Sequence, residues 1–167
     1  MELDELIYTY SDYLYRIAYS YVKDEQSAEE VVQDVFFKFY KTSSRFENKA
    51  HIKTYLTRMI INRCYDYLRS WKHKKNTIFE VIHQKIKGVD LETIEQEEET
   101  FIWQSILLLP VKYRETIILY YYEELSIKEI AELLQTPEST IKSRLQRGRL
   151  QLKSSLQDTE WEVLKNE

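Results

Sequence analysis

The sequence predicts an all-α protein in which two small helical domains are joined by an acidic linker. The 167-residue chain has only two glycines and two prolines, so few residues interrupt a helix. Over long stretches, apolar residues recur at i, i+3, i+4 and i+7, which is the spacing of one helix face. Residues 76–100 hold seven acidic and two basic residues. This acidic segment predicts a linker between domains at 1–75 and 101–156, and an acidic tail follows at 157–167.

The overall charge of −4 conceals two basic blocks. Residues 38–75 hold eleven Lys or Arg against two acids, and residues 136–153 hold five against one. Two separate basic blocks indicate a polyanion that is contacted at two places. The single cysteine, Cys64, excludes an internal disulfide and favours a reducing cytoplasm. We expect no signal peptide, because the N-terminus has no basic region followed by an apolar run. We expect no membrane insertion either, because no apolar run approaches the roughly 20 residues of a membrane span.

The first two helices are expected at residues 3–22 and 25–41. The first is given a packing role only. The second buries a stripe that runs from Ala28 to Phe39. Its opposite face presents four residues, namely Glu30, Gln33, Asp34 and Phe37. An apolar anchor with an acidic rim is typical of a protein-docking patch for a basic partner. The alternative is a lone exposed aromatic residue, which is common and needs no function.

A polar loop at 42–49 precedes a long helix expected from about Lys49 to Trp71. Cys64 falls on the inward side of this helix, so we assign it to the core. The outward side interleaves aromatic, guanidinium and amide groups, from Tyr55, Arg58, Asn62, Tyr65 and Arg69. Aromatic and arginine planes stack on unpaired bases, so this face suits opened or single-stranded DNA. The alternative is a solvated amphipathic helix whose arginines reach into water.

Two further helices are expected around Pro110, within residues 101–124. The second, from Tyr113 to Glu123, is apolar nearly all round and should form the core of the C-terminal domain. Ser126 and Glu129 then form an S-x-x-E capping box, which predicts a helix start. After Gln135 interrupts the pattern, Thr136 and Pro137 predict an N-cap and a first-turn proline for a second helix.

This second helix combines an apolar face with a basic, hydrogen-bonding face. Ile141, Leu145, Gly148 and Leu152 share one side, and Gly148 would let another helix approach closely. The other sides carry Ser139, Thr140, Lys142, Ser143, Arg144, Gln146, Arg147 and Arg149. A short helix, a sharp turn and a basic helix are typical of a helix-turn-helix, whose second helix enters the major groove. The alternative is a solvated surface helix in an ordinary bundle.

The sequence has no features that indicate an enzyme. We find no glycine-rich phosphate loop, no metal cluster and no nucleophile–base set, so no catalytic residue, metal or cofactor is expected. A stand-alone helix-turn-helix regulator, which would bind duplex DNA without polymerase, stays open as an alternative. A structural helical adaptor is a weaker one, because it leaves both basic blocks unexplained.

Three segments resemble the extracytoplasmic-function (group 4) sigma factors, the smallest members of the sigma-70 family. AEEVVQDVFFKFY, residues 28–40, is similar to the region 2.2 signature. TYLTRMIINRCYDYLR, residues 54–69, is similar to regions 2.3 and 2.4, with Leu56, Asn62, Asp66 and Arg69 matching and Tyr55 in place of the usual Trp. Residues 109–156 are similar to region 4, and TIKSRLQRGRLQL carries its most specific motif.

The resemblance implies a sigma factor that binds core RNA polymerase and directs promoter-specific initiation. The Phe37 face would bind polymerase. Arg45, Phe46 and Asn48 in the loop, with the outward face of the long helix, would receive the opened strand of the −10 element. The helix-turn-helix would read the −35 element in the major groove. Many members of the family are held inactive by an anti-sigma factor, so the resemblance adds such a partner to promoter DNA and polymerase.

Overall fold

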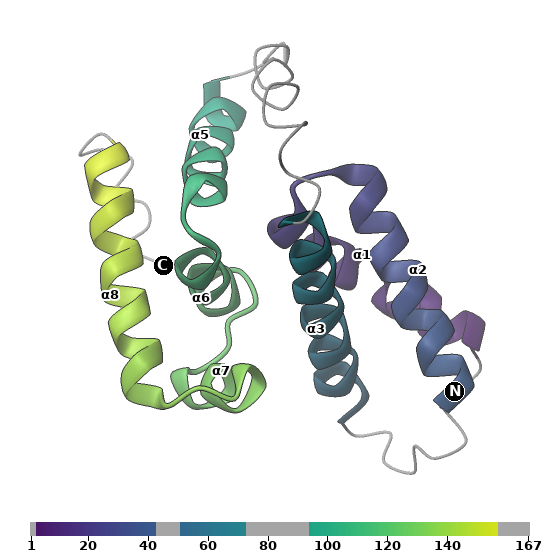
Figure 1. Cartoon of the computed structure of the whole chain (residues 1–167). Helices are drawn as coiled ribbons and strands as arrows, with labels where there is room; N and C mark the ends of the chain where they lie inside the picture. The colour runs from purple at the N-terminus through teal and green to yellow at the C-terminus, as the bar shows by residue number, and fades with distance from the viewer. Residues whose placement is uncertain (1–2, 43–50, 73–93, 157–167) are drawn as a thin grey trace. The chain divides into compact units, whose positions relative to one another are not determined.

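The computed structural model describes residues 3–42, 51–72 and 94–156, and within these ranges the regular structure is helical (Figure 1). By contacts, the chain divides into two compact units, Met1–Thr77 and Ile78–Glu167. The prediction of an all-α protein with two helical domains is therefore confirmed.

In the described part of the first unit there are three helices, each of which packs on the other two (Figure 1). They are α1 (Leu3–Val22), α2 (Glu25–Thr42) and α3 (Ile52–Lys72). The first two agree with the prediction within one residue, whereas α3 begins at Ile52 rather than at about residue 49. The most deeply buried core side chains are Leu6, Leu14, Ile17, Ala18, Ala28, Val31, Leu56, Ile60 and Cys64.

Hydrogen bonds between helices supplement this apolar core. The Tyr13 hydroxyl of α1 lies 2.8 Å from Thr57 Oγ1 of α3, and both groups are buried. The Ser27 hydroxyl at the start of α2 lies 2.7 Å from the Tyr67 hydroxyl of α3. Buried polar groups are stable only when paired, so these contacts set how the helices align along their axes.

Cys64 belongs to the core, as the helical spacing predicts. It is completely buried, and desolvation raises the pKa of its thiol to about 12. A thiol that stays protonated is a poor nucleophile and a poor metal ligand. Cys64 therefore acts as a small apolar side chain in the packing of α3.

The second unit contains α5 (Ile94–Leu108), α6 (Val111–Tyr121), α7 (Ile127–Leu134) and α8 (Glu138–Ser155). Helix α5 begins at Ile94, inside the segment expected to be a linker up to residue 100. Glutamate is a strong helix former, so the acidic run from Glu95 continues the helix toward its N-terminus. The rest of the expected linker and the acidic tail lie outside the described residues.

Helix α6 forms the centre of the second unit, as its apolar pattern predicts. Every residue from Tyr113 to Leu119 is buried, including Arg114. The Arg114 guanidinium donates hydrogen bonds to the carbonyl oxygens of Leu107, at 2.8 Å, and Leu109, at 3.2 Å. These carbonyls at the end of α5 have no partner within the helix, so Arg114 caps α5 from inside the core. None of the described helices is long and apolar enough to cross a membrane.

Candidate nucleic-acid interface

Helix α7 begins with the predicted capping box. Ser126 Oγ accepts a hydrogen bond from the Glu129 amide at 3.2 Å, and Glu129 Oε2 accepts one from the Ser126 amide at 2.8 Å. Hydrogen bonds from the Ser126 hydroxyl and amide lower the pKa of the Glu129 carboxyl below its usual 4.5. The box therefore satisfies two amides that the helix leaves unpaired, and it sets the direction of α7.

The turn between α7 and α8 differs from the prediction at Thr136. Gln135 ends α7 in the left-handed conformation, with φ of 51°. The Thr136 hydroxyl donates to the Leu134 carbonyl at 3.1 Å instead of accepting from an amide of α8. Pro137 is the N-cap residue, and its carbonyl accepts the first α8 bond from Ile141 at 3.1 Å. The expected Thr136 cap is wrong because this hydroxyl is used to close the preceding helix.

The buried face of α8 is the one that the sequence predicts. Ile141, Leu145, Gly148 and Leu152 are all buried. A Cβ atom added to Gly148 would lie 3.0 Å from Ile117 Cγ1 of α6. The glycine therefore permits the close approach of α8 to α6, as its place on the apolar face suggests.

The opposite side of α8 remains accessible along most of its length. Ser139, Lys142, Ser143, Gln146 and Arg147 are exposed, and Thr140 is half-buried. With α8 packed on α6 and preceded by the short helix α7, this is the arrangement that presents a helix to a DNA groove. All these residues were expected on this side.

Two arginines of α8 have specific partners inside the unit. Arg144 Nη1 lies 3.3 Å from Glu115 Oε1, and the Glu115 side chain is only 2% exposed. Arg149 Nε donates to the Tyr121 hydroxyl at 2.7 Å, and its guanidinium lies over the rings of Tyr120 and Tyr121. Both arginines therefore hold α8 on α6, a role that helical spacing alone does not reveal.

A polar groove of about 440 Å³ opens between the start of α6 and the first half of α8. Its lining consists of Lys112, Tyr113, Ser139, Thr140, Ser143, Arg144 and Arg147. The neighbouring Arg147 side chain is the main cause that lowers the pKa of the Tyr113 hydroxyl below 10.0, and Lys112 adds to it. The sequence did not identify Lys112 and Tyr113 as residues of this site. The only signal that pointed to them was Gly148, which predicted that another helix approaches α8 closely.

In the first unit, the outward side of α3 is exposed as predicted. Arg58, Asn62 and Arg69 are exposed, and Arg69 forms an ion pair with Asp66 one turn away. The Tyr55 ring is partly exposed and makes an edge contact with Phe39, with ring centroids 6.1 Å apart. Tyr65 is half-buried instead, because its ring packs edge-on against Tyr21 of α1, 5.6 Å between centroids. The Arg45, Phe46 and Asn48 assignments lie outside the described residues.

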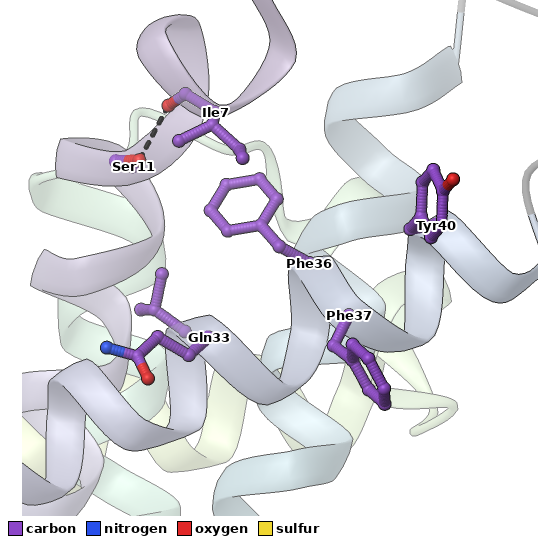
Figure 2. A pocket seen from close by; sticks show the side chains of 7 residues that line it. Ile7, Ser11, Gln33, Phe36, Phe37 and Tyr40 are labelled. Atoms are coloured by element: carbon purple, nitrogen blue, oxygen red, sulfur yellow. Dashed lines mark hydrogen bonds between the residues drawn. The ribbon is translucent and has the colours of Figure 1, made fainter. Parts of the chain in front are cut away.

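The outer face of α2 presents more apolar surface than the sequence suggests. Phe37 is 62% exposed and Tyr40 is 61% exposed. They border a groove of about 370 Å³, which is also lined by Ile7, Ser11, Val32, Gln33 and Phe36. In Figure 2 the Phe36 ring points toward Ile7 of α1, whereas Phe37 and Tyr40 point away from it. Phe37 is therefore part of an exposed apolar patch, which favours the docking interpretation over a lone aromatic residue.

The rim of this patch is polar and carries charges of both signs, and it is linked to α3. Glu30, Gln33 and Asp34 are all exposed. Asp34 Oδ2 lies 2.7 Å from Arg63 Nη2 of α3. The Lys41 ammonium lies 4.2 Å from the centroid of the Phe37 ring. Among the described residues, no group of three or more His, Cys, Asp or Glu is placed to hold a metal ion.

Comparison with known proteins identifies both units. Residues 6–73 match the model of Sigma-70 region 2, and residues 102–152 match that of Sigma-70 region 4. The ECF RNA polymerase sigma factor SigM of Bacillus subtilis (strain 168) is 30% identical over 157 residues, which cover 92% of this chain and 94% of SigM. The chain belongs to the extracytoplasmic-function sigma factors of the sigma-70 family. A second B. subtilis relative, RNA polymerase sigma factor SigV, is 31% identical over 142 residues, covering 80% of this chain and 78% of SigV.

Two solved structures share the fold. RpoE of Bartonella quintana, solved in complex with the anti-sigma factor NepR, is 23% identical with a TM-score of 0.67, over 90% of this chain and 94% of RpoE. CnrH, solved in complex with the cytosolic domain of CnrY, is 20% identical with a TM-score of 0.64, over 91% of this chain and 85% of CnrH.

As a sigma factor, the protein directs transcription initiation, and the alternative of a stand-alone regulator is not favoured. Sigma factors are generally DNA-binding initiation factors without enzymatic activity, and the absence of catalytic motifs in the sequence is consistent with this.

Proposed function

We propose that this sigma factor binds core RNA polymerase through the patch on α2 and contacts promoter DNA with α3 and α8. The observation that carries the proposal is the exposed patch of Phe37 and Tyr40, whose rim includes the carboxylates of Glu30 and Asp34 and the amide of Gln33. An apolar anchor that is ringed by charge fits a partner with a basic, partly apolar surface. Cytoplasmic localisation follows from the partners proposed, since polymerase and chromosomal DNA are found there.

The second part of the proposal concerns the two DNA-contacting surfaces. The exposed side of α8 suits the major groove of an intact −35 duplex, since it combines basic and hydroxyl side chains. The outward side of α3, with Tyr55, Arg58, Asn62 and Arg69, suits the bases of an opened −10 strand, which stack on aromatic and guanidinium planes. In these terms, residues 1–75 form the polymerase-binding and −10 domain, and residues 101–156 form the −35 domain.

An anti-sigma factor is a further proposed partner. The sigma factor RpoE, which shares the fold, was solved with the anti-sigma factor NepR, and this supports a regulator of that kind for the present chain. Such a regulator should abolish run-off transcription when it is added before core polymerase.

A run-off transcription assay with core polymerase and a genomic promoter library tests the proposal directly. Phe37→Ala should reduce the affinity for core polymerase by roughly tenfold or more, as expected when an interface anchor is truncated. Tyr8→Ala is a matched control, since Tyr8 is an exposed aromatic residue of the same unit, 91% accessible and outside the groove. Transcripts from no promoter, or equal polymerase binding by the Phe37 variant, would contradict the assignment.

A further inference from the structure

The polar groove between α6 and α8 (the α6–α8 groove) is lined by cations and hydroxyl groups, and none of its lining residues is acidic. The cations belong to Lys112, Arg144 and Arg147, and the hydroxyl groups belong to Tyr113, Ser139, Thr140 and Ser143. Ammonium, guanidinium and hydroxyl groups are among the side-chain groups that bind the phosphate oxygens of DNA. The chemistry of the lining therefore suits an anion that has several oxygen atoms.

Two of the three cations are not paired with an acid. Lys112 and Arg147 are both exposed, and among the described residues neither takes part in an ion pair. The Lys112 ammonium lies 4.9 Å from the centroid of the Tyr113 ring, a neutral partner that leaves the charge of the lysine in place. The groove therefore has a positive potential on both of its sides, one from α6 and one from α8.

The third cation helps to fix the spacing of the two helices. Arg144 Nη1 lies 3.3 Å from Oε1 of Glu115, whose side chain is only 2% exposed. One turn further along α8, a Cβ atom added to Gly148 would lie 3.6 Å from Tyr113 Cβ. Packing as close as this leaves α6 and α8 little freedom to move apart, so the groove keeps its width before a ligand binds. A site that is organised in advance loses less freedom on contact.

We propose that one backbone phosphate of the promoter duplex binds in this groove, between Lys112 of α6 and Arg147 of α8. This inference rests on the proposed role of α8 in contacting duplex DNA, and it adds a DNA-contacting residue outside α8. Phosphate contacts fix position and register without reading sequence, so the groove side sets how α8 lies on the duplex. Gln146 is exposed but does not line the groove, so it is available for a base edge.

A cycle that combines protein substitutions with DNA modifications tests the proposal on the holoenzyme, formed from the full chain and core polymerase. The probe is a promoter duplex that is active in the run-off assay, with each phosphate of its upstream element replaced in turn by a neutral methylphosphonate. On the unmodified duplex, Lys112→Ala should weaken binding by about two- to fivefold, the range of one exposed charge pair. The slope of log affinity against log salt should become shallower by about 0.9.

The methylphosphonate positions show where each side chain acts. At one position the modification should remove the effect of Lys112→Ala, because the phosphate charge that the lysine contacts is already absent. Arg147→Ala should show its coupling at the same position. Lys112→Ala should weaken binding equally on duplexes of different base sequence, whereas Gln146→Ala should change base preference.

Lys153→Ala is the matched control. Lys153 is an exposed lysine of the same unit that does not line the groove, so its replacement should show no coupling to the phosphate at which Lys112 acts. Since both lysines are exposed, neither replacement should change the free energy of unfolding in urea appreciably. An effect of Lys112→Ala on DNA binding is then not a consequence of unfolding.

Each result separates this inference from the proposed function. If Lys112→Ala leaves the salt dependence unchanged, couples to no phosphate or changes base preference, the phosphate site is refuted. An effect of Arg147→Ala or Gln146→Ala would in that case keep the role of α8. Coupling of Lys112 and Arg147 to phosphates that are not neighbours would refute a shared site. If none of the three substitutions changes binding, the proposed DNA contact of α8 fails as well.

Discussion

Replacement of Gly148 by alanine tests the packing that places α8 on α6. The new Cβ atom would lie 3.0 Å from Ile117 Cγ1 and 3.2 Å from Ile117 Cδ1, which is closer than ordinary van der Waals contact. Ile117 is completely buried, so it has little space into which it can move. Overpacking of this kind costs about 1–3 kcal/mol. Alanine in place of glycine returns about 1 kcal/mol in helix propensity. We therefore expect a net loss of about 1 kcal/mol in the free energy of unfolding.

Urea unfolding of the full chain measures this loss. Unfolding is monitored by the fluorescence of Trp103 of α5, in a chain whose other two tryptophans are replaced by phenylalanine. Gln151→Ala is the matched control, because Gln151 is exposed on α8 and its replacement creates no contact in the core. Gly148→Ala combined with Ile117→Val should cost less than the sum of the two single changes, since valine lacks the Cδ1 atom. An increase in stability for Gly148→Ala would show that helix propensity outweighs the contact and would refute the reasoning.

Three further predictions follow from single contacts. Arg144→Ala should lower the free energy of unfolding by about 2 kcal/mol. This is less than the full cost of breaking a buried ion pair, because Arg144 is partly exposed. A loss of DNA affinity at unchanged stability would show instead that Arg144 acts mainly on DNA. Ser126→Ala should cost about 1 kcal/mol at pH 6 in urea unfolding. Ser126 lowers the folded-state pKa of Glu129 below 4.5. The stability that Ser126 adds through the Glu129 carboxylate is therefore present above pH 4.5 and is lost as the pH falls through the folded-state pKa. An equal cost of Ser126→Ala at pH 3 and at pH 6 would contradict the capping box. Cys64, with a pKa of about 12 and no exposure, should react with iodoacetamide far more slowly in the native chain than in urea, and equal rates would contradict its burial.

Helix positions were predictable where local signals were strong. The capping box placed the start of α7, and helical periodicity alone identified the buried face of α8. The linker assigned to residues 76–100 stays a prediction, although α5 already starts at Ile94 within that segment. One local prediction failed for an identifiable reason. The Thr136 hydroxyl was assigned to α8, although the carbonyl of Leu134 lies within its reach.

The candidate sites were predictable as faces but not as sets of contacts. The outer face of α2 was recognised by its sequence, whereas the groove beside it also requires Ile7 and Ser11 of α1. Spacing along one helix says nothing about which residue of a neighbouring helix lies opposite. For the same reason Tyr65, which shares the outward stripe of α3, is half-buried against Tyr21.

The sequence by itself determined the helical class, the buried stripe of α8, the polar side opposite it and the basic charge of the two segments that we propose to contact DNA. These properties depend on residue types at local spacing, and they hold in any arrangement of the helices. Only the tertiary structure decided which arginines of α8 have partners on α6. Arg144 and Glu115 are 29 residues apart, and Arg149 and Tyr121 are 28 apart. Such pairs form only where α8 crosses α6, because the crossing, and not the local periodicity, sets which side chains meet.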